Sequence, residues 1–156
     1  MRRIYLAGGC FWGMQGYFQK LKGVIFTTVG YANSQVHNPT YQQVKKQLTN
    51  AVETLEIYYQ ESEISLKELL DHFFAVIDPT ALNYQADDFG TQYRNGVYYE
   101  INDDLVVIRE KIAKIQGQYD KPIVTEVEKI TNYFLAEEEH QNYTNKHPDV
   151  VCHIKF

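Results

Sequence analysis

The sequence predicts an α+β fold, in which helices pack on a mainly antiparallel sheet to form a two-layer sandwich. Segments rich in β-branched and aromatic residues alternate with amphipathic segments in the order strand, helix, strand, strand, helix, strand, helix, strand. The chain has 156 residues, of which 44% are hydrophobic. Because this length supports one core and no stretch resembles a linker, we expect a single domain over residues 1–156.

The first half of the chain contains three expected strands, at residues 4–7, 24–31 and 51–59. Two glycines follow the first strand, and Trp12, Phe18 and Leu21 then recur at helical spacing, which predicts a helix. A polar loop at 32–39 and a short helical turn near 41–46 separate the second strand from the third.

The second half begins with the most clearly marked helix, because Ser65 and Glu68 form a capping box before an apolar stripe that runs to Ile77. A long polar loop is expected at 78–95, a strand at 96–100, a helix at about 104–115 and a last strand at 123–127. The segment 136–143 is polar and compatible with a helix. An irregular tail of about 144–156 contains Cys152.

Composition excludes several classes of function. The formal net charge is −5 and the isoelectric point is about 5.5, so we expect no general attraction to nucleic acid or to an anionic membrane. No apolar run approaches the length of about 18 residues that spans a bilayer, and no export signal is recognisable, which predicts a cytoplasmic protein.

The chain has two cysteines, without a C-x-x-C pair or the ligand spacing of a zinc site. In a reducing compartment such thiols are catalytic or inert rather than permanently bonded. We expect no bound metal or cofactor.

Cys10 is the first candidate for chemistry, because it falls at the expected first turn of a helix, after Gly8 and Gly9. Unpaired N–H groups and the helix dipole favour negative charge there, so we expect a lowered thiol pKa and a nucleophilic thiolate. The neighbouring aromatic residues Phe11 and Trp12 suit a pocket wall. The alternative is a small, buried and inert cysteine.

Glu53 is the second candidate, because strand alternation places its carboxyl group on the face of Leu55, Ile57 and Tyr59. Burial disfavours the charged form, and a raised pKa suits a proton donor. The alternative is a glutamate at the strand end that reaches solvent.

Two further clusters are weaker. The loop from Asp87 to Arg94 brings a carboxylate, an amide and a phenol together, although adjacent aspartates usually form a solvated turn. His140 follows three consecutive glutamates, which suggests a metal cluster only at first sight, since consecutive helical residues point in different directions. We interpret this segment as a solvated acidic face.

Several motifs together resemble one known family, the A-type peptide-methionine sulfoxide reductases, and they occur in the same order over nearly the whole chain. They are Gly-Cys-Phe-Trp-Gly at 9–13, Val-Gly-Tyr-Ala at 29–32, Asn-Pro-Thr-Tyr at 38–41, Glu53, Gly-Thr-Gln-Tyr-Arg at 90–94, and Ala136-Glu137 with His140-Gln141.

The resemblance implies a ferredoxin-like α/β plait with extra helices, and reduction of the S epimer of methionine sulfoxide, free or in proteins, to repair oxidative damage. It implies that Cys10 attacks the sulfur and that Glu53 protonates the departing oxygen. The remaining roles implied are hydrogen bonds to that oxygen from Tyr31 and Tyr93, a slot for the substrate methyl group formed by Phe11 and Trp12, and a contact of Asp88 with the substrate backbone.

The resemblance also implies that Cys152 resolves a Cys10 sulfenic acid as a disulfide, which thioredoxin or another dithiol then reduces. Three departures from the family pattern occur: Asn50, Ala51 and Val52 replace a Gly-His-Ala stretch, Cys152 lies in a segment without glycine, and Glu138-Glu139 replace an aspartate and an aromatic residue. We expect a monomer.

Two other functions compete with this one. Ferredoxin-like sheets also present aromatic residues to single-stranded RNA, but the acidic isoelectric point and the lack of an RNP-type motif count against RNA binding. A thiol peroxidase or a disulfide oxidoreductase could use the same cysteines, although the latter usually has a C-x-x-C pair.

Overall fold

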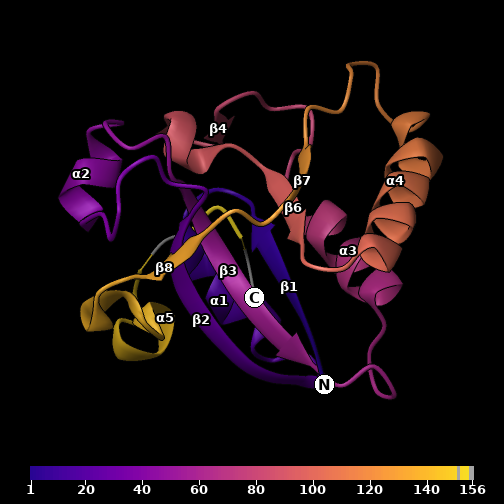
Figure 1. Ribbon diagram of the computed structural model, residues 1–156, viewed down its shortest axis with the longest axis horizontal. Helices are drawn as coiled ribbons and strands as arrows, with labels where there is room; N and C mark the ends of the chain where they lie inside the picture. Colours follow the sequence, from indigo (N-terminus) through magenta and orange to yellow (C-terminus); the bar gives the residue numbers. More distant parts are fainter. Residues whose placement is uncertain (151, 155–156) are drawn as a thin grey trace.

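The computed structural model describes residues 1–150 and 152–154. Its centre is a six-stranded sheet in the order β7-β6-β1-β3-β2-β8 (Figure 1). Neighbouring strands are antiparallel, except that β6 and β7 run parallel. The strands are β1 Arg2–Ala7, β2 Val24–Ala32, β3 Val52–Tyr59, β6 Gly96–Tyr99, β7 Glu126–Lys129 and β8 Tyr133–Leu135. A separate hairpin consists of β4 Tyr84–Gln85 and β5 Asp88–Phe89.

Two of the helices, α2 and α3, begin at a capping box. The Ser65 side chain accepts from the Glu68 backbone N–H, and the Glu68 side chain accepts from the Ser65 N–H, so the expected capping box is present. Thr40 and Gln43 form a second capping box. The helices are α1 Phe11–Phe18, α2 Tyr41–Lys45, α3 Leu66–Val76, α4 Asn102–Gln116 and α5 Tyr143–Lys146, with 3₁₀ turns η1 Thr91–Tyr93 and η2 Glu138–His140.

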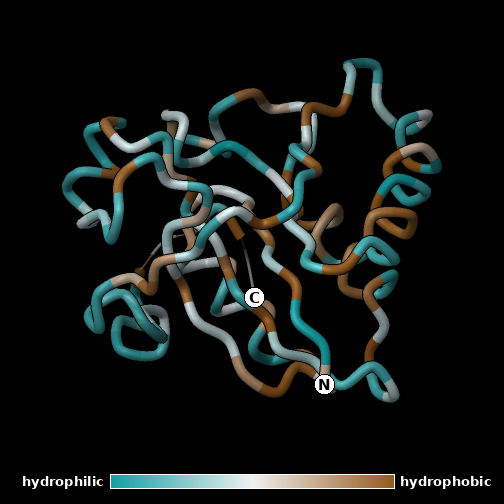
Figure 2. Tube along the Cα trace, in the orientation of Figure 1, coloured by the Kyte–Doolittle hydropathy of each residue, from teal (hydrophilic) through white to brown (hydrophobic). Residues whose placement is uncertain are grey.

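The two faces of the sheet have different coverings. The larger core joins one face to helices α1, α3 and α4, through residues that include Leu6, Leu55, Phe73 and Ile108. The smaller cluster lies on the other face, where Ile130 of the connection from β7 to β8 and Tyr133, the first residue of β8, pack against it. Figure 1 shows α1 behind the strands and this connection in front of them. Figure 2 shows hydrophobic and hydrophilic residues alternating along α4, as expected of a helix with one buried side.

The mixed α/β class is confirmed, and the segment β1-α1-β2-β3-α3-β6 follows the expected order. The ferredoxin-like plait stays a prediction, since β7 and β8 extend the sheet beyond that segment. Two expectations were wrong in detail. The last expected strand, at 123–127, is β7 at Glu126–Lys129, and the three-residue strand β8 was missed. Strand β7 pairs with β6, and strand β8 pairs with β2. Each of these partners is distant in the sequence, so no local pattern marks either strand.

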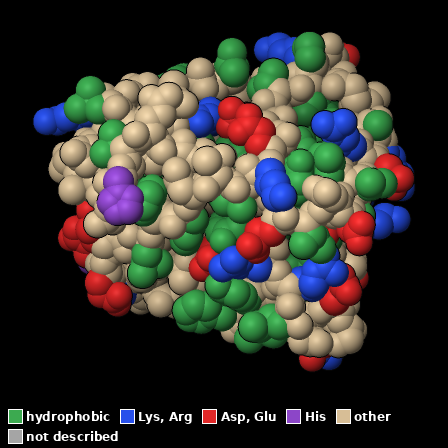
Figure 3. Space-filling view, viewed as in Figure 1, with side chains coloured by type: hydrophobic (Ala, Val, Ile, Leu, Met, Phe, Trp, Pro, Cys, Tyr) green, Lys and Arg blue, Asp and Glu red, His purple; other side chains and the backbone are tan. Residues whose placement is uncertain are grey.

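The surface carries charges of both signs. On the face that Figure 3 shows, basic and acidic side chains are intermingled. Within the part of the chain that the structure describes, none of the helices has the length and apolar character needed to cross a membrane.

Candidate active site

Cys10 occupies the N-cap position of α1, one residue before the helix begins. The chain reaches it through Gly9, whose φ of +86° lies in the region that favours glycine. A side chain at Gly8 would also collide with Ile77, since a Cβ there would lie 2.6 Å from the Ile77 Cγ2. The two glycines thus allow the sharp turn from strand to helix at which Cys10 lies. Both described cysteines are free.

The expected lowering of the Cys10 pKa was wrong. The backbone N–H of Trp12 does lower it, as a helix start should, but burial of the thiol is the larger effect, and the negative charge of Glu53 adds to it. The pKa of Cys10 is therefore well above its ordinary value. The helix has only eight residues, and its partial charge does not compensate for the loss of solvation. In the resting protein Cys10 is a thiol rather than a thiolate.

Glu53 lies within the protein core beside Cys10. Its side chain is 2% exposed, and its Oε1 accepts a hydrogen bond of 3.3 Å from the backbone N–H of Phe11. Burial raises the pKa of Glu53 to about 8, an effect that the Phe11 N–H reduces and the charge of Asp88 increases. The carboxyl group is therefore largely protonated at neutral pH, and the alternative of a solvent-exposed glutamate is excluded.

Three phenols surround this carboxyl group. Tyr31 is the direct antiparallel neighbour of Glu53 across β2 and β3. Tyr93 ends the turn η1, and Tyr41 begins α2. Burial raises the pKa of all three, and the Glu53 charge raises each of them further. Tyr41 was not among the predicted site residues, although it belongs to a quoted motif.

The phenols differ in their hydrogen bonds. Tyr31 donates its only hydroxyl proton to Glu137 Oε1 at 2.7 Å, and Glu137 Oε2 accepts from the backbone N–H of Tyr41 at 2.9 Å. The Tyr93 hydroxyl has no hydrogen-bond partner within residues 1–150 and 152–154. Of the two phenols expected to bind the substrate oxygen, Tyr93 is the one with an available proton.

Asp88 also faces this site from the hairpin strand β5. Its charge raises the pKa of Cys10, of Glu53 and of Cys152. Its own pKa is raised by burial, an effect that His153 reduces. Asp88 is partly exposed, whereas the carboxyl group of Glu53 is buried.

The two aromatic residues after Cys10 differ in exposure. Phe11 is fully buried, and its ring centre lies 5.8 Å from that of Tyr31. Trp12 is partly exposed and stacks on Tyr143, with ring centres 3.7 Å apart and planes within 6°. Of these two residues, therefore, only Trp12 reaches the surface.

Cys152 lies against the first turn of α1. A Cβ placed on Gly13 would be 3.1 Å from the Cys152 Cβ and 3.5 Å from its Sγ, so only glycine leaves ordinary room for this side chain. The next residue, His153, makes a 2.7 Å hydrogen bond between Nε2 and the Gly8 carbonyl oxygen. The tail thus already holds its cysteine near Cys10 without any glycine of its own.

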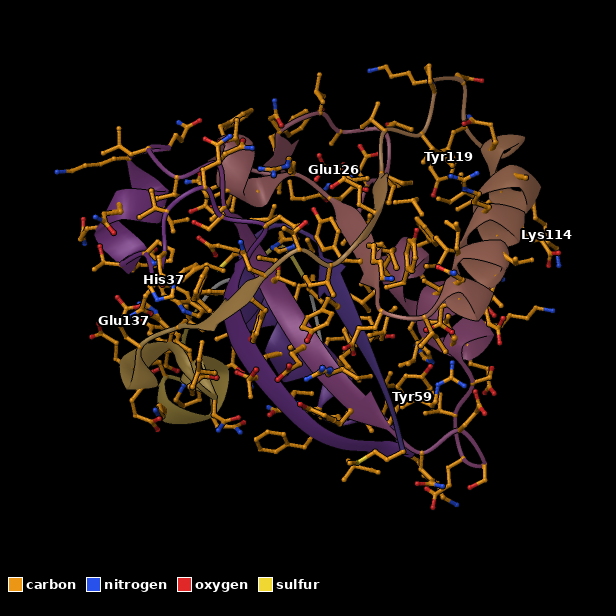
Figure 4. All side chains as sticks on the ribbon, in the orientation of Figure 1. His37, Tyr59, Lys114, Tyr119, Glu126 and Glu137 are labelled. Atoms are coloured by element: carbon orange, nitrogen blue, oxygen red, sulfur yellow. The ribbon has the colours of Figure 1, made fainter. Side chains whose placement is uncertain are left out.

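The interpretation of residues 137–140 as a solvated acidic face was wrong for His140, whereas the three glutamates of this segment are exposed as expected. His140 is 5% exposed, and Glu137 bridges Tyr31 to α2. Figure 4 shows Glu137 between α2 and the α5 region, and Figure 2 shows how hydrophilic this region is, which explains the error. His140, which ends the short turn η2, is the residue of this turn that is buried. Among the described residues, no three His, Cys, Asp or Glu side chains are placed to hold a metal ion.

Comparison with known proteins decides the family. A family model described as peptide methionine sulfoxide reductase matches residues 2–156. The chain belongs to the peptide methionine sulfoxide reductase family. It is accordingly an enzyme of the oxidoreductase class.

Relatives of this reductase support the assignment over the full length. Peptide methionine sulfoxide reductase MsrA of Metamycoplasma arthritidis is 54% identical and covers 100% of both chains. The same enzyme of Mycoplasma genitalium is 54% identical and covers 100% of this chain and 99% of its own.

Solved structures share the reductase fold. Reduced Mxr1 from Saccharomyces cerevisiae has a TM-score of 0.93 at 34% identity, covering 99% of this chain and 91% of its own. A structure of Mxr1 in complex with Trx2 matches with a TM-score of 0.65 at 27% identity, covering 91% of this chain and 84% of its own.

Proposed function

We propose that this reductase acts on the S epimer of methionine sulfoxide, free or in oxidised proteins, with Cys10 as nucleophile and Glu53 as proton donor. One observation carries the proposal: a carboxyl group with a pKa of about 8 is buried against the backbone of the residue that follows the cysteine. A sulfoxide oxygen leaves poorly unless it is protonated, so the reaction needs a soft nucleophile and an acid together.

The protonation states support this pairing. Glu53 in its neutral form can give a proton to the sulfoxide oxygen, which makes the sulfur more electrophilic. Until that proton is given, Glu53 has no negative charge to oppose ionisation of Cys10. As the Cys10 sulfur attacks, its thiol proton replaces the proton that Glu53 gave, the sulfur–oxygen bond of the substrate breaks, and a hydroxyl group ends on the Cys10 sulfur. The sulfoxide is thereby reduced to a thioether, and Cys10 is oxidised to a sulfenic acid. The titrations of Cys10 and Glu53 are coupled.

The phenols would stabilise the charge that develops on the oxygen. Tyr93 has a free hydroxyl proton for this purpose, whereas Tyr31 must exchange Glu137 for the substrate. Phe11 and Trp12 supply the apolar surface for the methyl group, and Asp88 is the acceptor for a substrate backbone N–H.

Cys152 completes the cycle in this proposal. Its thiol condenses with the Cys10 sulfenic acid, forming a disulfide and releasing water. Thioredoxin or another dithiol then reduces the disulfide and becomes oxidised itself. The solved complex of the related Mxr1 with Trx2 supports thioredoxin as the partner. We propose further that the chain works in the cytoplasm as a monomer, with one catalytic domain at 1–156 and a tail from about 144 that carries the resolving cysteine.

A coupled assay on the separated epimers tests the proposal. The wild type should oxidise a dithiol in the presence of the S epimer and not the R epimer, and Cys10→Ser should be inactive. Cys152→Ser should release one equivalent of thioether and then stop with thioredoxin as reductant. Consumption of the S epimer by Cys10→Ser would contradict the assignment of the nucleophile.

A further inference from the structure

His140 is the most enclosed imidazole near the site, and the proposed reaction gives it no role. It lies in η2 and packs against three aromatic rings from two other helices. Its ring centre is 4.4 Å from that of Tyr41 on α2, and 5.7 Å and 5.9 Å from those of Phe11 and Trp12 on α1. The imidazole therefore fills the space behind the wall that borders the substrate.

One hydrogen bond determines the tautomer of His140. The indole Nε1–H of Trp12 points at the His140 Nδ1 at a distance of 3.1 Å. An indole nitrogen can only donate, so Nδ1 must accept and the ring proton must lie on Nε2. Nε2 is buried and has no hydrogen-bond partner in the described part of the chain, and the Glu139 carboxylate lies 3.8 Å away. The neutral ring with a lone pair on Nδ1 is the form that binds Trp12.

We propose that His140 is a positioning residue for substrate binding, which fixes the orientation of the Trp12 indole by accepting its N–H. Without this acceptor the indole still stacks on Tyr143. It loses, however, the hydrogen bond that fixes how the indole is rotated within the plane of that stack. The inference rests on the proposed function, because it matters for turnover only if Trp12 borders the substrate. Trp12 is the only tryptophan in the chain, so its fluorescence reports on this contact directly.

Protonation of His140 should break the contact. Imidazolium has a proton on both nitrogens and no acceptor, so its Nδ1–H would oppose the indole N–H. The titratable groups that face the ring are Glu137 and Glu139 beside it in the chain and Tyr41 on α2. The two carboxylates favour the charged imidazolium, but burial opposes it more strongly and lowers the pKa of His140. The contact is therefore intact at neutral pH and is lost in acid.

The test compares three variants by fluorescence. His140→Leu keeps an apolar side chain and removes the acceptor, whereas His140→Asn keeps an oxygen near the position of Nδ1. His147→Leu is the matched control, since His147 is exposed and contacts Tyr143 rather than Trp12. Circular dichroism establishes that each variant is folded. The emission of wild type and of His147→Leu should change with a midpoint below the ordinary histidine pKa of about 6.5. That transition should be absent in His140→Leu, while any change near pH 8 from Glu53 remains.

Kinetics then measure the consequence for substrate. At pH 7.5, His140→Leu should raise KM for methionine sulfoxide about fivefold, the loss expected for one hydrogen bond, and change kcat less than twofold. His140→Asn should recover most of the affinity. Equal emission-pH curves for wild type and His140→Leu would overturn the proposal for His140. That result would leave the proposed roles of the other site residues unchanged.

The failure of the proposed function would look different. If the acid transition is lost in His140→Leu but KM is unchanged, Trp12 does not border the substrate, and both its role in the slot and that of His140 are refuted. If the wild type fails to reduce the S epimer, the proposed chemistry is refuted.

Discussion

Glu53 is a residue whose burial disfavours its charged form in the fold and which the proposed mechanism needs as proton donor. Its carboxyl group is buried beside Cys10, among tyrosines and Asp88, and in this environment the neutral form is favoured. The same burial that makes it a proton donor near neutral pH disfavours the charged form at higher pH. Activity and stability should therefore both depend on the ionisation of Glu53.

The first prediction concerns activity. Glu53→Gln keeps an acceptor for the Phe11 N–H but has no proton to give, so the chemical step should slow by about 10²- to 10⁴-fold with little change in substrate affinity. In the wild type the single-turnover rate should fall as pH rises through about 8, because the donor is then ionised. Rapid-quench measurement of thioether formation checks both, and an unchanged rate in Glu53→Gln would remove this residue from the mechanism.

The second prediction concerns stability. The Glu53 pKa is about 8 in the folded protein and about 4.5 in the unfolded chain, so ionisation destabilises the fold progressively as pH rises from 4.5 to 8. Glu53→Gln has no such dependence. It should be more stable than the wild type by on the order of 4 kcal/mol at pH 8, and about equally stable at pH 4. Urea unfolding at the two pH values measures this difference, and an equal difference at both would refute the linkage.

The third prediction separates the two phenols. Because Tyr31 donates its proton to Glu137 and Tyr93 donates to no described residue, loss of the Tyr93 hydroxyl should cost more transition-state stabilisation. Tyr93→Phe should lower kcat about 10²-fold, and Tyr31→Phe less than about tenfold. Steady-state kinetics with saturating reductant measure both. The opposite order would mean that breaking the hydrogen bond from Tyr31 to Glu137 costs little when substrate binds.

At the scale of elements, two capping boxes offer a matched comparison. Thr40 starts α2, whose first residue Tyr41 contacts Glu137 and His140, whereas Ser65 starts α3, which packs in the core away from the phenols. Loss of either cap should cost about 1 kcal/mol in helix stability. For α2, with only five residues, that loss is large relative to the helix itself.

The fourth prediction follows from this difference. Thr40→Ala should raise KM for methionine sulfoxide or lower kcat severalfold, because Tyr41 and the Glu137 bridge lose their support. Ser65→Ala should lower the unfolding free energy by about 1 kcal/mol and leave both kinetic constants unchanged. Thermal denaturation alongside the coupled assay distinguishes them. Equal kinetic effects would show that α2 does not position the site.

At the scale of the whole molecule, the features that could be predicted correctly from the sequence are those that neighbouring residues in the chain determine. The Ser65 box, the turn at Gly8-Gly9 and the alternation around Glu53 are each decided by neighbours in the chain, and each was confirmed. The remainder depends on distant partners. Strand β8 exists because it pairs with β2, and His140 is buried because α1 and α2 enclose it. The Cys10 pKa was predicted wrongly because desolvation by the complete fold exceeds the effect of the local helix.

The last prediction concerns the oxidised protein, in which Cys10 and Cys152 form a disulfide. A bond between Cys10 and Cys152 would join the first helix to the tail and enclose a loop of about 140 residues, which restricts the unfolded state strongly. The native tail already contacts Gly8 and Gly13, so closure requires little rearrangement of the folded state. The oxidised protein should therefore be more stable than the reduced protein by about 2–4 kcal/mol. Urea unfolding of both forms measures the difference, with mass spectrometry to establish the bond and Cys152→Ser, which should not respond to oxidant, as control. A bonded form with an equal or lower midpoint would show that closure pulls the tail out of its place beside α1.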